Sequence, residues 1–231
     1  MSYGNYSGEF RKYTKKHLNI HDSIIDGYQD LNFGGVESSV TPTVIEERKL
    51  NVAAMSVFDR LMMDRILWLA GPVDDRMSTI VQAQLLFLDQ LDSTTPITLH
   101  IDSPGGSVKS GLSMVDQIEL CSSPIATINT GMAASMGSVL LGAGTKGMRS
   151  SLRHSRTMLH QSSGGAGGNI QDARITFGEW EKVNNELFKL LGEYCGKTAE
   201  QVAVDASRDF WLSASEAKDY GIIDEIVLPN R

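Results

Sequence analysis

The chain has few cysteines, no long apolar run and no secretion signal. Its two cysteines, Cys121 and Cys195, lie far apart and form no Cys-x-x-Cys pair. Neither a disulfide framework nor a metal cluster is therefore expected, and a reducing compartment is indicated. No apolar run reaches the ~18 residues that a membrane-spanning helix needs, and the basic N-terminal residues are followed by polar sequence. We expect a cytoplasmic protein without a membrane partner.

An excess of basic residues is also missing. The 28 acidic residues outnumber the 21 basic ones and give a net charge of −7. Because nucleic-acid binding needs a concentrated basic face, nucleic acid is not expected as a partner. With 41% hydrophobic residues in a chain of 231, the protein can bury a substantial core.

Two regions of different character follow each other along the chain. Residues 1–40 are rich in Gly, Ser, Asn and Tyr, and their apolar residues keep no period. This composition is typical of a flexible or processed extension. Residues 41–231 carry periodic apolar patterns and are expected to form the folded domain.

Within the second region, β-like runs alternate with amphipathic helical patterns. Strands are expected at residues 66–70, 96–102, 124–130, 156–160 and 222–228. Helices are expected at residues 52–62, 77–91, 108–120, 169–195, 198–206 and 215–221. Such alternation predicts a layered α/β domain with its active site at the carboxyl ends of strands.

The stretch GMAASMG at residues 131–137 joins a predicted strand to a short apolar run. A sharp turn from strand to helix exposes the residue at the turn near the positive end of the helix dipole. Here that residue is Ser135, whose small neighbours leave room for a substrate. The stretch is typical of a nucleophile elbow, and a small-residue packing turn is the alternative.

Acyl transfer by a serine also needs a base and a group that orients the base. His160 is the strongest candidate for the base, because it ends a predicted strand beside the glycine-rich loop 164–168. Asp205 and Asp209 flank the turn before Trp211, and either could orient the histidine or cap a helix. The residues alone leave this choice open.

Two backbone N–H groups could stabilise the oxyanion of such a reaction. The SPGG turn at residues 103–106 follows a predicted strand, and its glycines free N–H groups to face a ligand. The N–H of Met136, directly after the serine, is the candidate for the second donor.

Four ordered motifs resemble those of the ClpP family, the proteolytic subunits of the Clp protease. They are SPGG at 103–106, AASMG at 133–137, MLHQ with a glycine loop at 158–168, and RDFWLSA at 208–214. The separations between the motifs agree as well, and the resemblance covers roughly residues 41–231.

The resemblance implies a role for each candidate residue. Ser135 would be the nucleophile, and His160 the general base and then the general acid. Asp209, rather than Asp205, would orient His160. The N–H groups of Gly106 and Met136 would form the oxyanion hole.

The resemblance also implies an architecture and partners. Family members have a crotonase-like fold of repeated β-β-α units with a projecting handle, here at about residues 161–195. Two seven-membered rings of identical subunits stack into a tetradecamer that encloses a proteolytic chamber. An AAA+ Clp ATPase feeds unfolded polypeptides into this chamber and uses the ATP, so no cofactor and no metal are expected in this subunit.

The sequence departs from the family pattern at three places. The usual proline two residues after the histidine is Ser162, which predicts a freer loop. The usual acidic residue before Arg208 is Ser207, so the usual ion pair between rings is not expected. Thr98 and His100 stand where aromatic residues often form the ATPase docking face.

Two other functions fit parts of this pattern. A catalytically silent ring subunit would share the fold, although such relatives usually lose a triad residue and none is lost here. A crotonase-type acyl-CoA enzyme would share the fold and a two-donor oxyanion hole, but it has no need for a Ser-His-Asp set. The complete set favours a serine endopeptidase.

Overall fold

The computed structural model describes residues 43–48 and 51–228 and divides into two units, one up to Val57 and one from Phe58 on. In the first unit, β1 (Thr43–Arg48) and β2 (Asn51–Ser56) form an antiparallel pair. The helix expected at residues 52–62 is therefore wrong in its first half, and α3 (Val57–Met63) begins only after β2. Pairing with β1 overrides a short apolar pattern that fits either period. The expected boundary near residue 40 lies outside the described residues.

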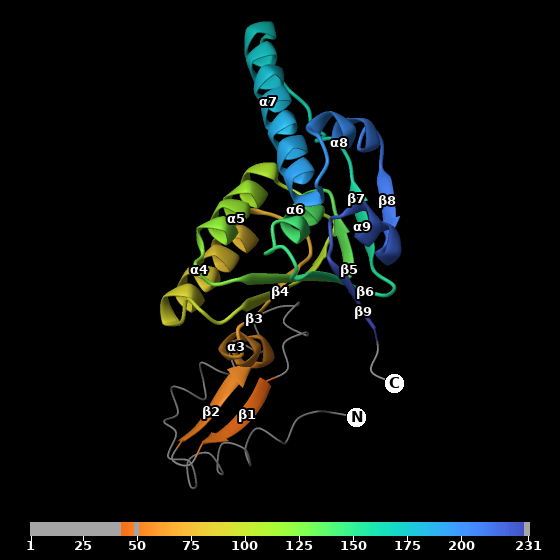
Figure 1. The fold of residues 1–231 in the computed structure, drawn as a ribbon. Coiled ribbons are helices and arrows are strands. Elements are labelled where there is room, and N and C mark those ends of the chain that lie inside the picture. The colour runs from red at the N-terminus through yellow and green to blue at the C-terminus, as the bar shows by residue number, and fades with distance from the viewer. Residues whose placement is uncertain (1–42, 49–50, 229–231) are drawn as a thin grey trace, which may run out of the picture. The chain divides into compact units, whose positions relative to one another are not determined.

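The second unit is built on a seven-stranded sheet (Figure 1). Five of its strands are parallel and neighbour one another in the order β3 (Ile66–Ala70), β4 (Ile97–Ser103), β5 (Ile125–Ala134), β6 (Arg149–Leu152) and β9 (Glu225–Val227). The sequence pattern did not predict β6. The expected strand at residues 124–130 is extended to Ala134 in β5.

The long strand β5 divides its second edge between two partners. Its residues 127–129 pair with β6, whereas its residues 132–134 pair in parallel with β7 (Arg156–Leu159). The strand β8 (Phe210–Ser213) then pairs antiparallel with β7. As a result, the ends of β5 and β7 and the start of β8 lie side by side.

Helices connect and cover these strands. They are α4 (Asp75–Leu91), α5 (Val108–Leu120), α6 (Met136–Gly142), α7 (Ile170–Cys195), α8 (Ala199–Asp205) and α9 (Ala214–Tyr220). Figure 1 shows α4 and α5 along one face of the sheet and α7 projecting beyond it. Side-chain caps explain several helix starts, such as Asp74 before α4 and Asn169 before α7. Gly196 ends α7 in the left-handed conformation that glycine adopts readily.

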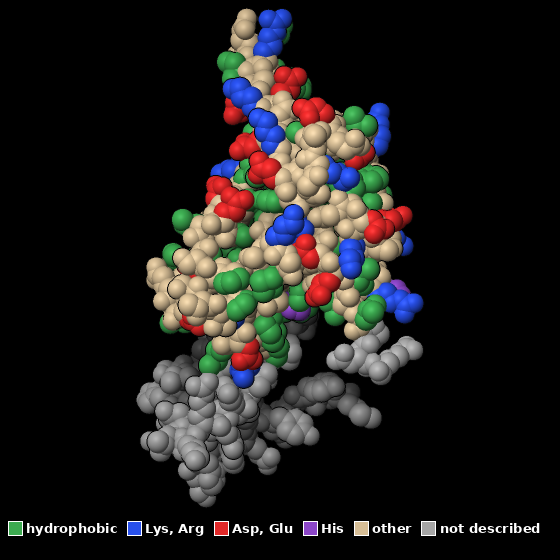
Figure 2. Space-filling model, in the orientation of Figure 1, with side chains coloured by type: hydrophobic (Ala, Val, Ile, Leu, Met, Phe, Trp, Pro, Cys, Tyr) green, Lys and Arg blue, Asp and Glu red, His purple; other side chains and the backbone are tan. Residues whose placement is uncertain are grey.

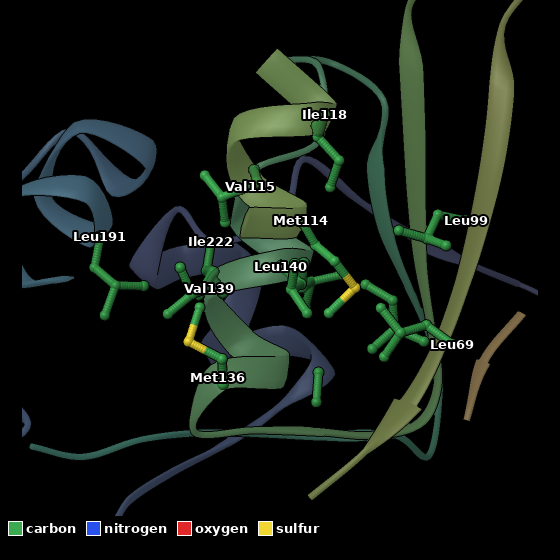
Figure 3. Close-up of a cluster of buried hydrophobic side chains, with 14 of the residues drawn as sticks. Leu69, Leu99, Met114, Val115, Ile118, Met136, Val139, Leu140, Leu191 and Ile222 are labelled. Carbon is green, nitrogen blue, oxygen red and sulfur yellow. The ribbon is translucent and has the colours of Figure 1, made fainter. Parts of the chain in front are cut away.

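The core lies between the sheet and these helices. Figure 3 shows Leu69 and Leu99 of the sheet in one cluster with Met114 of α5 and Leu140 of α6. These side chains are fully buried, and burial of a large apolar side chain stabilises a fold by roughly 2 kcal/mol. Every residue of α6 is buried. The helix that follows the elbow is thus fixed in the core and holds the turn before it.

Candidate active site

Ser135 occupies the turn between β5 and α6 in a strained backbone conformation. Its φ of 54° and ψ of −122° are unusual for a residue with a side chain. The turn is anchored by a hydrogen bond of 2.9 Å from the Ser135 N–H to the carbonyl of Met158 in β7. Strain of this kind is typical of functional turns, and of the nucleophile elbow in particular.

Strand pairing brings His160 to this serine. The end of β7 lies beside the end of β5, with Met158 opposite Ala134, and His160 directly follows Leu159, the last residue of β7. Its Nε2 lies 2.8 Å from the Oγ of Ser135. This is hydrogen-bonding distance for a base and its nucleophile.

Pairing of β7 with β8 places Asp209 on the other side of the imidazole. Leu159 pairs with Phe210 across β7 and β8, so the residues next to this pair, His160 and Asp209, become neighbours. The Oδ1 of Asp209 lies 3.2 Å from the Nδ1 of His160. The three side chains form a continuous chain of hydrogen bonds.

Asp205 has different partners. Its two carboxylate oxygens accept hydrogen bonds from the Tyr220 hydroxyl and the Gln201 side-chain amide, each at 3.0 Å. Burial of Tyr220, together with its hydrogen bond to Asp205, raises the pKa of that phenol. Asp205 therefore ties α8 to α9, and the structure brings only Asp209 to His160.

The glycine turn at residues 103–106 packs directly against the elbow. Gly105 and Gly106 have φ values of 88° and 151°. A Cβ on Gly105 would lie 2.7 Å from the Ser135 Cβ and 2.8 Å from the Met136 nitrogen, so only glycine allows this approach. Hydrogen bonds of 2.8 Å from Val73 N–H to Gly105 and from Ser107 N–H to Val73 hold the turn in place.

This packing leaves the expected oxyanion donors available. Among the described residues, neither the Gly106 nor the Met136 N–H donates a turn or loop hydrogen bond. Met136 is the first residue of α6, where an N–H has no partner within the helix. Met136 directly follows Ser135, and Gly106 follows the glycine that packs against the elbow, so each N–H can donate to a ligand.

One small pocket is lined by Ser135 itself, and a larger groove shares Val108 and Ser162 with that pocket. The lining of this small pocket, of about 20 Å³, includes Ser135 and His160 together with the apolar Val139, Phe188 and Leu191. A groove of about 340 Å³ lies between residues 106–109 on one side and Ser162, Ser163, Trp180 and Val183 on the other. The arrangement offers a small pocket beside the reacting atoms and a larger groove that adjoins this pocket.

The segment after His160 is not a free loop at its start. The Ser162 N–H and Oγ both donate to the Oδ1 of Asn184 in α7, at 2.9 and 3.0 Å. Ser162, in place of the usual proline, thus forms hydrogen bonds to α7, whereas the sequence had predicted a freer loop after His160. No strand is assigned to residues 161–168 within the described chain.

Other sites for ions or phosphate find little support. Among residues 43–48 and 51–228, no group of three His, Cys, Asp or Glu side chains could hold a metal ion. Two glycine patterns, GAGTKG at 142–147 and GKT at 196–198, each begin at the end of a helix rather than after a strand. They therefore lack the setting of a phosphate-binding loop.

No helix in the described residues is long and apolar enough to span a membrane.

Comparison with known proteins identifies close relatives. The family model described as Clp protease matches residues 48–230. The chain is 46% identical to an ATP-dependent Clp protease proteolytic subunit of Bacteroides fragilis (strain YCH46), over 95% of this chain and 98% of the relative. The protein of the same description from Porphyromonas gingivalis is 46% identical over 96% and 99% of the two chains. That from Streptococcus salivarius is 45% identical over 82% and 98%.

Proposed function

Because the chain belongs to the Clp protease family and is a Clp-type peptidase, we propose that Ser135, His160 and Asp209 carry out its peptide hydrolysis. The observation that carries the proposal is the continuous hydrogen-bond chain, at 2.8 Å from Ser135 to His160 and 3.2 Å from His160 to Asp209. With the Nδ1 proton directed to Asp209, the Nε2 of His160 is free to accept the serine proton.

The reaction then proceeds as acyl transfer. Ser135 Oγ attacks the scissile carbonyl while His160 removes its proton. The negative oxygen of the tetrahedral intermediate accepts hydrogen bonds from the N–H groups of Gly106 and Met136. His160 next protonates the leaving amine, and a water molecule repeats the sequence to release the acyl group.

The proposal includes an assembly of two stacked seven-membered rings. Its support is the projecting part of α7, where Ile170, Ile175 and Phe177 are 73%, 72% and 52% exposed. Figure 2 shows charged side chains of both signs interspersed along this helix. A second copy that covers α7 would bury these apolar side chains and so stabilise the assembly.

The expected energy-dependent partner is an AAA+ ATPase that delivers unfolded polypeptide. The relatives are described as ATP-dependent proteolytic subunits, which supports a partner that consumes the ATP; for this subunit itself we propose no cofactor. An apolar hollow of about 500 Å³ beside Ile66, Trp68 and Ile80 is our candidate docking face. His100 belongs to the same sheet face and stacks on Trp68 at 4.8 Å. A cytoplasmic location fits this role.

The test is labelling of the assembled protein with a fluorophosphonate, followed by mass spectrometry and a peptidase assay. We expect the adduct on Ser135, and we expect Ser135→Ala to lose both labelling and peptide cleavage. A pure, assembled protein that neither labels nor cleaves short peptides would instead be a silent ring subunit. Acyl-CoA turnover that survives Ser135→Ala would support a crotonase-type enzyme.

A further inference from the structure

One row of side chains along helix α7 consists of Phe177, Trp180, Asn184, Leu187 and Leu191, and its two ends lie in different environments. Phe177 is half exposed, whereas Leu187 and Leu191 are buried and line the small apolar pocket beside Ser135. Asn184 lies between these parts, is partly buried, and is the polar member of an otherwise apolar row. A polar side chain in such a row is explained by what it binds.

Asn184 binds the segment that leaves the catalytic histidine. Its Oδ1 accepts hydrogen bonds from both the N–H and the hydroxyl of Ser162. Among the described residues, no other hydrogen bond joins residues 161–168 to α7. The Gln161 N–H instead donates to the Ala206 carbonyl at 2.9 Å, at the end of α8. The segment is therefore fixed between α8 on one side and α7 on the other.

This double attachment matters because β7 ends before His160. Leu159 is the last paired residue of β7, so the backbone of His160 lies between a strand and the two attachments at Gln161 and Ser162. Ser162 also lines the small apolar pocket, the groove, and a third cavity of about 540 Å³ beside Asp209. A shift of this residue would alter the imidazole position and every cavity around the triad.

We propose that Asn184 is a positioning residue of the peptidase, which acts through Ser162 to hold His160 in line with Ser135. The inference rests on the proposed triad and extends it to α7. A proline at position 162 would lack the N–H and restrain the backbone through its ring. In this chain, hydrogen bonds to Asn184 replace that restraint. Alignment of the imidazole thereby depends on how α7 is docked.

The experiment compares Asn184→Ala with two matched variants of the assembled protein. Asn185→Ala makes the same change at the next, exposed position of α7, and Asn184→Asp keeps an acceptor oxygen. We measure kcat and KM for a short fluorogenic peptide, and the rate of fluorophosphonate labelling across pH. Asn184→Ala should lower kcat and the labelling rate about tenfold with KM within twofold, since misalignment by a fraction of an ångström is costly. Asn184→Asp should recover most of the loss, and Asn185→Ala should match the wild type.

A double-mutant cycle with Ser162→Pro separates positioning from folding. Proline removes both donors at once, so Asn184→Ala should cost nothing further in that background. An equal loss in both backgrounds would show that Asn184 acts elsewhere, and a change in KM alone would also overturn the inference. If the wild type labels at Ser135 while Asn184→Ala labels equally fast, the inference fails and the proposed triad stands. If the wild type does not label, the proposed function itself fails.

Discussion

Two contacts between an aspartate and a nitrogen-bearing side chain are built in opposite ways in this protein. The guanidinium of Arg149 is buried, and it donates to both oxygens of Asp224, at 2.6 and 3.0 Å, and to the carbonyls of Tyr194 and Gly221. The proposed catalytic pair of His160 and Asp209 has a single contact of 3.2 Å, and the Asp209 side chain is 63% exposed.

The difference shows what fixes each pair. Arg149 joins β6 to the segment before β9 and to the ends of α7 and α9, so its own hydrogen bonds hold those elements together. His160 and Asp209 meet because β7 and β8 are paired, and their exposed contact adds little stability of its own. The Arg149–Asp224 pair thus stabilises the elements around it, whereas the pairing of β7 with β8 positions the proposed catalytic pair, His160 and Asp209.

The largest expected effect comes from removing the base. His160→Ala should lower peptide cleavage about 10⁴-fold, because the serine loses its proton acceptor and the leaving amine its proton donor. The thermal unfolding of the assembled protein should hardly change, since backbone pairing fixes this region. A peptidase assay and a thermal scan at equal protein concentration check both statements. Retention of a tenth of the activity would contradict the assigned role.

Breaking the buried Arg149–Asp224 pair should lower the stability and leave the activity nearly unchanged. Asp224→Ala leaves the Arg149 guanidinium without its carboxylate and should reduce the free energy of unfolding by about 3 kcal/mol. Urea unfolding measures this loss, with Asp219→Ala, an exposed aspartate of α9, as the matched control. Peptidase activity per folded molecule should remain near that of the wild type. Equal unfolding midpoints for the two variants would show that the Arg149 network adds no stability.

A smaller effect is expected from Asp209→Asn. The amide can donate to Nδ1 and so favour the imidazole tautomer whose Nε2 no longer accepts the serine proton. Because Asp209 is exposed, the amide can also rotate, and we expect a loss in kcat of about tenfold to a hundredfold. Steady-state kinetics measure it. Loss of folding in this variant would contradict the view that the catalytic pair is supported by the backbone.

The smallest effect is the pH dependence of the buried pair. Burial raises the pKa of Asp224, but hydrogen bonds and charge from Arg149 outweigh this and hold the pKa below its ordinary value of 3.8. Its contribution to stability is therefore complete above that ordinary value and is lost as the pH falls through the folded pKa. The difference in unfolding temperature between wild type and Asp224→Ala should be constant from pH 7 to about pH 5 and should shrink below about pH 4. A constant difference down to pH 3 would contradict this.

The sequence by itself determined many of the local elements and the sharp turn at Ser135. The strands expected at 66–70 and 96–102 and the helix at 108–120 agree with β3, β4 and α5. Small residues around Ser135 and glycines at 105 and 106 predict their turns, because steric room is a property of neighbours along the chain. These features depend on a few adjacent residues, so they can be predicted from the local sequence.

Tertiary structure decided which distant residues meet. The residues alone left Asp205 and Asp209 as equal candidates, and the resemblance favoured Asp209; the pairing of β7 with β8 brings Asp209 to His160 and leaves Asp205 with Tyr220. Strand pairing, here of β2 with β1, also explains why β2 replaces the first half of the helix expected at residues 52–62. The link from Ser162 to Asn184 was likewise invisible in the sequence. Strand register and helix docking depend on contacts between segments far apart in the chain, and no local pattern encodes those distances.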